Sequence, residues 1–68
     1  MTEIDYRICK IIKYFNEIHN TDPTVNDIAK VINYSISATR YHLNKLIKFK
    51  LIKKEDRKYF LLVDNVKE

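Results

Sequence analysis

The chain has 68 residues, one cysteine, no glycine and a formal net charge of +4. This length fits a single domain with a thin stability margin, and the lone Cys9 excludes both a disulfide framework and a Cys/His zinc pattern. No apolar run approaches the roughly 20 residues that span a membrane, and no phosphate-binding glycine loop or Ser/His/Asp grouping is present. We therefore expect a cytoplasmic protein that is not an enzyme, needs no cofactor and has no membrane partner.

The first expected helix covers residues 3–19. Thr2 can cap its N-terminus, with Asp5 at the third position of a capping box. Apolar residues at alternating spacings of four and three are expected to face the core: Ile4, Ile8, Ile11, Phe15 and Ile18, widened by Ile12. His19 is expected to close the helix rather than to bind a ligand, because a cation suits the negative end of the helix dipole.

A turn or short strand is expected at residues 20–23, which contain the one proline. A second helix over residues 25–32 follows, with Thr24 as N-cap and Asp27 at the third position. Its buried face should consist of Val25, Ile28, Ala29 and Ile32. Asn33 lies where the chain must turn sharply, and Asn tolerates the left-handed conformation better than any residue except glycine.

Ser35 can cap a third helix over residues 36–49. One face is expected to pack in the core: Ile36, Thr39, Leu43, Leu46 and Ile47. The opposite face is polar or small, with Arg40 and His42 at its flanks: Ser37, Ala38, Tyr41, Asn44, Lys45 and Lys48. No acidic residue occurs from Ser35 to Lys54, so this face carries one sign of charge. His42 is expected to be a flanking residue, neither catalytic nor metal-binding.

Two short apolar runs after the third helix predict a β-hairpin over residues 51–63, with strands at 51–54 and 59–63 joined by a charged turn. Three consecutive apolar residues, Phe60, Leu61 and Leu62, make one strand face more apolar than a core requires. Two alternatives are equal for that face: burial under the first helix and the tail, or contact with a partner. A short polar tail, 64–68, follows.

The positive charge is concentrated in one third of the chain. Residues 35–59 hold eight Lys and Arg against two acids, a net charge of +6, whereas the segments before and after each sum to −1. Such a concentration is typical of a surface that binds a polyanion.

Three helices followed by a hairpin make an α+β chain that resembles the winged helix-turn-helix family over residues 4–63. The resemblance rests on a small residue between the second and third helices, an Asn at the turn, a polar start of the recognition helix, its core anchors and the start of the wing: Ala29, Asn33, Ser35, Ser37, Leu43, Leu46 and Leu51-Ile52. It is nearest to small prokaryotic regulators of the multiple-antibiotic-resistance and arsenic-repressor types, and to small winged-helix proteins of archaeal viruses and plasmids. It implies a sequence-specific protein that binds double-stranded DNA and regulates transcription.

In this family the third helix enters the major groove, and we expect the wing to meet the DNA backbone or the minor groove. The residues expected to contact DNA are Thr24, Asn26, Ser35, Ser37, Ala38, Arg40, Tyr41, Asn44, Lys45, Lys48, Lys53, Lys54, Arg57 and Lys58. Asn44 suits a bidentate contact to adenine, the cations suit phosphates, and the second helix can offer backbone N–H groups to a phosphate. The alternative is a protein–protein interaction module, although such modules usually carry acidic or apolar residues on the third helix.

A homodimer is also expected, because one recognition helix on one half-site rarely gives tight specific binding. No helix pattern follows the wing, which leaves two candidate surfaces: the outer side of the first helix (Tyr6, Cys9, Lys10, Lys13) and the exposed side of the last strand, 59–63. Tyr6 and Cys9 favour the helix because they fall away from its apolar stripe. Cys9 is expected to be an inert thiol rather than a redox switch.

Overall fold

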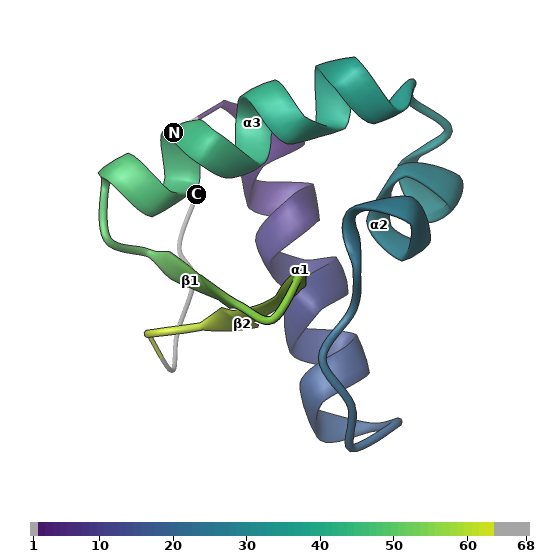
Figure 1. The fold of residues 1–68 in the computed structure, drawn as a ribbon, viewed down its shortest axis with the longest axis vertical. Coiled ribbons are helices and arrows are strands. Elements are labelled where there is room, and N and C mark those ends of the chain that lie inside the picture. Colours follow the sequence, from purple (N-terminus) through teal and green to yellow (C-terminus); the bar gives the residue numbers. More distant parts are fainter. Residues whose placement is uncertain (1, 64–68) are drawn as a thin grey trace.

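The computed structural model describes residues 2–63, so the tail expected at 64–68 lies outside the described residues. The elements are α1 (Glu3–Glu17), α2 (Val25–Ile32), α3 (Ile36–Lys48), β1 (Ile52–Glu55) and β2 (Lys58–Leu61). The predicted α+β layout is confirmed: three helices precede an antiparallel hairpin, and the layout matches a winged helix. Figure 1 shows α3 across the top of the view, α1 running down beneath it, α2 to the right and the hairpin to the left.

Each helix begins at the cap that the sequence predicts. Thr2 Oγ1 accepts a hydrogen bond from the Asp5 N–H (3.3 Å), and the Asp5 carboxylate accepts one from the Thr2 N–H (3.2 Å). Thr24 and Asp27 repeat this capping box at 3.2 and 3.0 Å. Ser35 Oγ accepts from the Ala38 N–H at 3.1 Å and caps α3. A cap of this kind contributes about 1 kcal/mol, and all three are local, which is why a sequence pattern finds them.

Sharp turns in this glycine-free chain use other residues in the left-handed conformation. Within residues 2–63 these are Asn20, Asn33, Lys50, Asp56 and Arg57. Asn33 has φ 60° and ψ 43° and ends α2, as predicted, and the Tyr34 N–H donates to the Ala29 carbonyl at 3.1 Å. Lys50 follows the end of α3 with φ 61°. The left-handed conformation costs a residue other than glycine roughly 1–2 kcal/mol. These turns therefore hold only because the packing of the flanking segments fixes them.

The prediction for the buried face of α1 is partly wrong. The helix ends at Glu17 instead of His19, and Ile18 is 65% exposed. Cys9, which was placed away from the core, is fully buried, so the expected dimer surface cannot include it. The reason is that α1 packs against α2, α3 and β2 together. The buried arc is therefore centred on different residues: Asp5, Ile8, Cys9 and Ile12.

The core joins the inner faces of all five elements and consists of Ile8, Cys9, Ile12, Ile28, Ile32, Leu43, Leu46, Ile52 and Tyr59. The expected face of α3 holds for Thr39, Leu43 and Leu46, but Ile36 lies at the exposed start of the helix. α3 ends at Lys48, one residue before the prediction. β2 ends at Leu61, before the predicted strand end at residue 63. Leu61 packs against the core and Phe60 is half-buried, while Leu62, just after the strand, is exposed.

The hairpin is held against α2 by a short extra pairing. β1 and β2 pair in register from Ile52↔Leu61 to Glu55↔Lys58, so the connecting turn is shorter than expected. Its two residues, 56 and 57, both have positive φ, the conformation of a type I′ turn. Thr24 forms an isolated bridge with Lys58, and the Tyr59 N–H donates to the Pro23 carbonyl at 2.9 Å. The N-terminus of α2 is therefore fixed beside the wing.

Candidate nucleic-acid interface

The outward face of α3 is a narrow polar stripe. It contains Ser37, Tyr41, Asn44 and Lys48, all exposed and spaced by four, three and four residues. Tyr41 is 66% exposed, and α3 contains no acidic residue. The stripe presents hydroxyl, amide and ammonium groups, which suit hydrogen bonds to base edges and phosphates. Two predicted contacts lie elsewhere: the Ser35 hydroxyl caps the helix, and Ala38 is half-buried.

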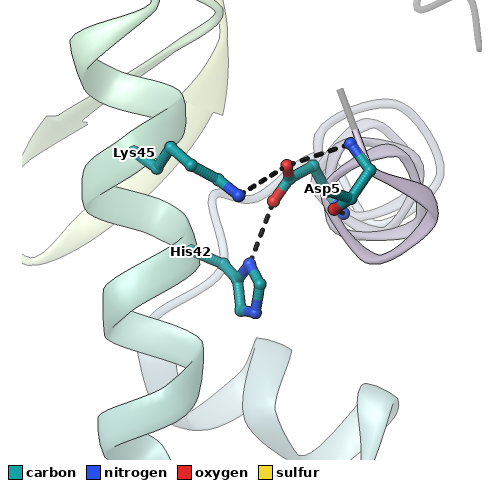
Figure 2. Close-up of polar contacts among 4 residues, drawn as sticks. Asp5, His42 and Lys45 are labelled. Carbon is teal, nitrogen blue, oxygen red and sulfur yellow. Dashed lines mark hydrogen bonds and ion pairs between the residues drawn. The ribbon is translucent and has the colours of Figure 1, made fainter.

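Lys45 does not lie on this outward stripe, which corrects the sequence prediction. Its Nζ lies 2.9 Å from Asp5 Oδ2, and His42 Nδ1 lies 3.0 Å from Asp5 Oδ1. Figure 2 shows both side chains of α3 reaching toward the single carboxylate at the start of α1. Lys45 is half-buried, and its charge is neutralised within the protein before any ligand is present. A contact between Lys45 and a DNA phosphate stays a prediction, and it would require Lys45 to leave this ion pair.

The Asp5 carboxylate is the polar link between α1 and α3. Burial by itself would raise the pKa of Asp5, but hydrogen bonds from Lys45, Thr2 and His42 outweigh burial and lower this pKa below its ordinary value. The carboxylate is therefore held ionised. Sequence reasoning treated Asp5 only as a capping residue. The sequence did contain a signal for its burial. Asp5 lies three residues before Ile8 and seven before Ile12, so helix geometry places it on the same buried face of α1.

A cleft of about 300 Å³ lies where α2, α3 and the hairpin meet. We call it the cationic cleft, and its lining residues are Thr24, Val25, Asn26, Arg40, Lys54, Arg57 and Tyr59. Five of these were predicted from the sequence to contact DNA, and the fold brings them together from three elements. Arg40, Lys54 and Arg57 are all exposed, and no acidic side chain is part of the lining. The cleft therefore suits an anion.

The N-terminus of α2 supplies a fourth positive contribution to the cationic cleft. In the capping box the N–H groups of Thr24 and Asp27 donate to each other's side chains. The N–H groups of Val25 and Asn26, in the first turn, have no intrahelical acceptor by helix geometry. Together with the positive end of the helix dipole they favour a negative group at this position, and the Asp27 carboxylate in the same turn offsets part of that positive potential.

Tyr59 forms a buried aromatic wall of the cationic cleft. Its side chain is buried, and the Lys54 Nζ lies 5.8 Å from the centre of its ring. Burial raises the pKa of Tyr59, while the positive charge of Arg40 acts in the opposite direction. The hydroxyl therefore stays protonated near neutral pH, and the cleft keeps its cationic character.

The four basic residues of the wing do not act as one group. Lys54 and its cross-strand partner Tyr59 share one face of the hairpin with Ile52 and Leu61. Lys53, Glu55 and Lys58 lie on the opposite face of the hairpin. There the Lys53 Nζ lies 3.7 Å from Glu55 Oε2. Lys54 and Arg57 line the cationic cleft, whereas Lys53 and Lys58 do not. The sequence shows that the wing is basic. It could not show which of its cations line the cationic cleft, because that depends on the pairing register of β1 and β2.

Cys9 is buried, which favours the expected inert thiol. Burial, helped by the negative charge of Asp5, raises the pKa of the Cys9 thiol to about 11. Among residues 2–63, no group of three or more His, Cys, Asp or Glu side chains is arranged to hold a metal ion. In the same part of the chain no helix has the length and apolar character needed to cross a membrane.

Fold and site together describe a small winged-helix domain with a cationic face built from α2, α3 and the hairpin. The chain belongs to the FaeA-like protein family, whose match covers residues 8–61. This match includes the whole of α2, α3 and the hairpin, and it is consistent with a small regulatory protein that binds DNA. A comparison with curated proteins gave no match.

Proposed function

We propose that this chain binds double-stranded DNA sequence-specifically and regulates transcription in the cytoplasm, with no catalytic role. In this proposal α3 enters the major groove, and the wing lies on the backbone or in the minor groove. The observation that carries it is the cationic cleft, where Arg40, Lys54 and Arg57 converge on the N-terminus of α2 beside a helix face free of acids.

The cationic cleft suits a single backbone phosphate. A phosphate at the α2 N-terminus accepts hydrogen bonds from backbone N–H groups and neutralises the converging cations. Such contacts fix the position of the protein on the duplex but do not read its sequence. The cleft therefore supports a docking role that sets the register of α3.

The outward stripe of α3 suits the reading of bases. Asn44 can bond two positions of an adenine in the major groove, and Ser37 can bond either bases or phosphates. Tyr41 offers an amphipathic contact beside them, and Lys48 a cation for a phosphate at the end of the helix. In this proposal only a few side chains of α3 contact the bases. Substitution of any one of them should therefore have a measurable effect on sequence preference.

The first prediction concerns salt. With roughly five neutralised phosphates, each lowering the slope of log K against log salt by about 0.9, affinity should fall about 100-fold for a threefold rise in salt. Fluorescence anisotropy with fragments of the source genome at several salt concentrations measures this slope. Absence of binding at low salt, or binding that ignores salt, would favour the protein–protein interaction module instead.

Paired variants separate docking from reading. Arg57→Ala should weaken binding to all sequences alike and make the salt slope shallower by about one phosphate contact. Asn44→Ala should change the ratio of affinities between sequences and leave the salt slope unchanged. Lys53→Ala is the matched control, since it removes a wing cation that does not line the cationic cleft. Equal effects of Arg57→Ala and Lys53→Ala would contradict the proposed role of the cleft.

A further inference from the structure

An apolar groove lies between α1 and α2, and its lining differs from that of the cationic cleft. Its volume is about 240 Å³, and it is lined by Lys10, Ile11, Tyr14, Phe15 and Val31. Tyr14 is 52% exposed and Val31 is 56% exposed. Ile18, one helical turn after Tyr14, is 65% exposed at the C-terminal cap of α1. Large apolar side chains thus form one exposed patch on the α1–α2 side of the domain.

This patch replaces the helix 1 surface that the sequence suggested. That surface contained Cys9, which is buried. The exposed stripe of α1 is instead formed by residues at spacings of four, three, four and three, all exposed: Glu3, Arg7, Lys10, Tyr14 and Glu17. Ile11, Phe15 and Ile18 border this stripe on the side of the groove, next to α2.

The order of side chains along the stripe is self-complementary. Lys10 and Glu17 are exposed residues of opposite charge that lie before and after Tyr14 along the helix. If a second α1 runs antiparallel across the first, with a two-fold axis beside Tyr14, residues 17 and 18 of one copy meet residues 10 and 11 of the other. The two meeting points lie about 5 Å on either side of the axis, from the helical rise of 1.5 Å per residue.

At both meeting points, the side chains of the two copies are then complementary. Ile18 of one copy is placed over the groove beside Ile11 of the other, where it removes apolar surface from water on both sides. Glu17 of one copy faces Lys10 of the other. A two-fold axis repeats each contact, which is the arrangement that isologous dimers require. A parallel alignment lacks this match, because it sets Lys10 against Lys10 and Glu17 against Glu17.

We propose that the α1–α2 groove is a homodimer interface in which α1 packs antiparallel on α1 of a second copy, with Ile18 in the groove and Lys10 paired with Glu17. The groove shares no lining residue with the cationic cleft. The interface does not depend on the proposed DNA binding, and its test requires no DNA.

Sedimentation velocity from micromolar to about 1 mM measures the dimer dissociation constant, a range that includes weak association. Ile18→Glu should weaken the dimer by tenfold or more, because it places a charge in an apolar groove. Leu62→Glu is the matched control: it adds the same charge at an exposed apolar residue of the hairpin end. A monomer at all concentrations, or a dimer disrupted by Leu62→Glu but not by Ile18→Glu, overturns the proposal.

Charge exchange tests the antiparallel arrangement itself. Lys10→Glu and Glu17→Lys should each weaken the homodimer by about fivefold, because each replaces two attractive pairs with two repulsive ones. The two variants mixed together should form a heterodimer with affinity near that of the parent, since both pairs are then complementary. The doubly exchanged chain should also regain the parent affinity. Failure of both rescues, with each variant melting like the parent, overturns the antiparallel pairing.

Discussion

At the scale of single residues, Asp5 is the polar link between α1 and α3. It caps α1 through Thr2 and also accepts from Lys45 and His42 of α3. Such a buried ion pair adds little over a well-packed apolar contact, but removal of one member leaves the other charge without compensation. Asp5 therefore sets how α3 lies on α1.

Asp5→Ala should lower the free energy of unfolding by about 2–3 kcal/mol, since it removes a cap and leaves Lys45 unpaired and half-buried. The matched control is Asp27→Ala, which removes the equivalent capping-box carboxylate of α2 at an exposed position. That loss should be about 1 kcal/mol. Urea unfolding of both variants measures the difference, and equal losses would show that the contact with α3 contributes nothing.

The same residue predicts a pH dependence. The pKa of Asp5 is lowered in the folded protein below its ordinary value of 3.8. Its contribution to stability is therefore complete above the unfolded pKa and is lost as pH falls through the folded pKa. The gap in stability between the parent and Asp5→Asn should be constant near neutral pH and shrink below about pH 4. A gap that persists unchanged into acid would mean that the carboxylate is not the stabilising form.

At the scale of elements, local signals predicted more than tertiary ones. The three N-caps and the left-handed Asn33 depend on residues within a few positions of each other, and the structure agrees with each prediction. The buried arc of α1 depends on three packing partners, so a count of apolar residues missed it. The contact between Asp5 and His42 spans 37 positions. The cationic cleft depends on the bridge of Thr24 with Lys58, which no local pattern contains.

The turn of the wing combines strain with charge. Asp56 and Arg57 have φ of 53° and 67°, where glycine or asparagine is usual. Arg57→Gly should therefore stabilise the fold by about 0.5–1 kcal/mol, because relief of left-handed strain exceeds the added chain entropy. It should also weaken DNA binding several-fold, because the cationic cleft loses a cation. Thermal melting and anisotropy on the same sample measure the two effects.

Asp56→Gly is the control for that variant, since it relieves the same turn but keeps Arg57. It should stabilise the fold by a similar amount while leaving DNA affinity unchanged or higher, because an acidic group beside the DNA is removed. If both variants bind DNA like the parent, Arg57 does not contact phosphate. If both destabilise the fold, the hairpin turn depends on side-chain contacts more than on backbone strain.

At the scale of the whole molecule, the fold brings together cationic side chains from α3 and the hairpin. The net charge is +4, yet Arg40, Lys54 and Arg57 share one cleft with the positive end of α2. Their mutual repulsion is a cost that a bound anion removes, and a ligand that binds only the folded state raises stability by mass action. The free protein should therefore be stabilised by an anion that fits the cleft.

Phosphate should raise the melting temperature more than chloride at equal ionic strength. For a dissociation constant near 10 mM, 100 mM phosphate adds about 1.4 kcal/mol, which is several degrees for a domain of this size. Phosphate also stabilises proteins by exclusion from their surfaces, so the difference must be compared with the variant Lys54→Ala/Arg57→Ala. Exclusion acts on both proteins alike, whereas occupancy of the cationic cleft acts only on the parent. An equal rise in parent and variant would mean that the converging cations do not form an anion site, and the docking role proposed for the cleft would fail with it.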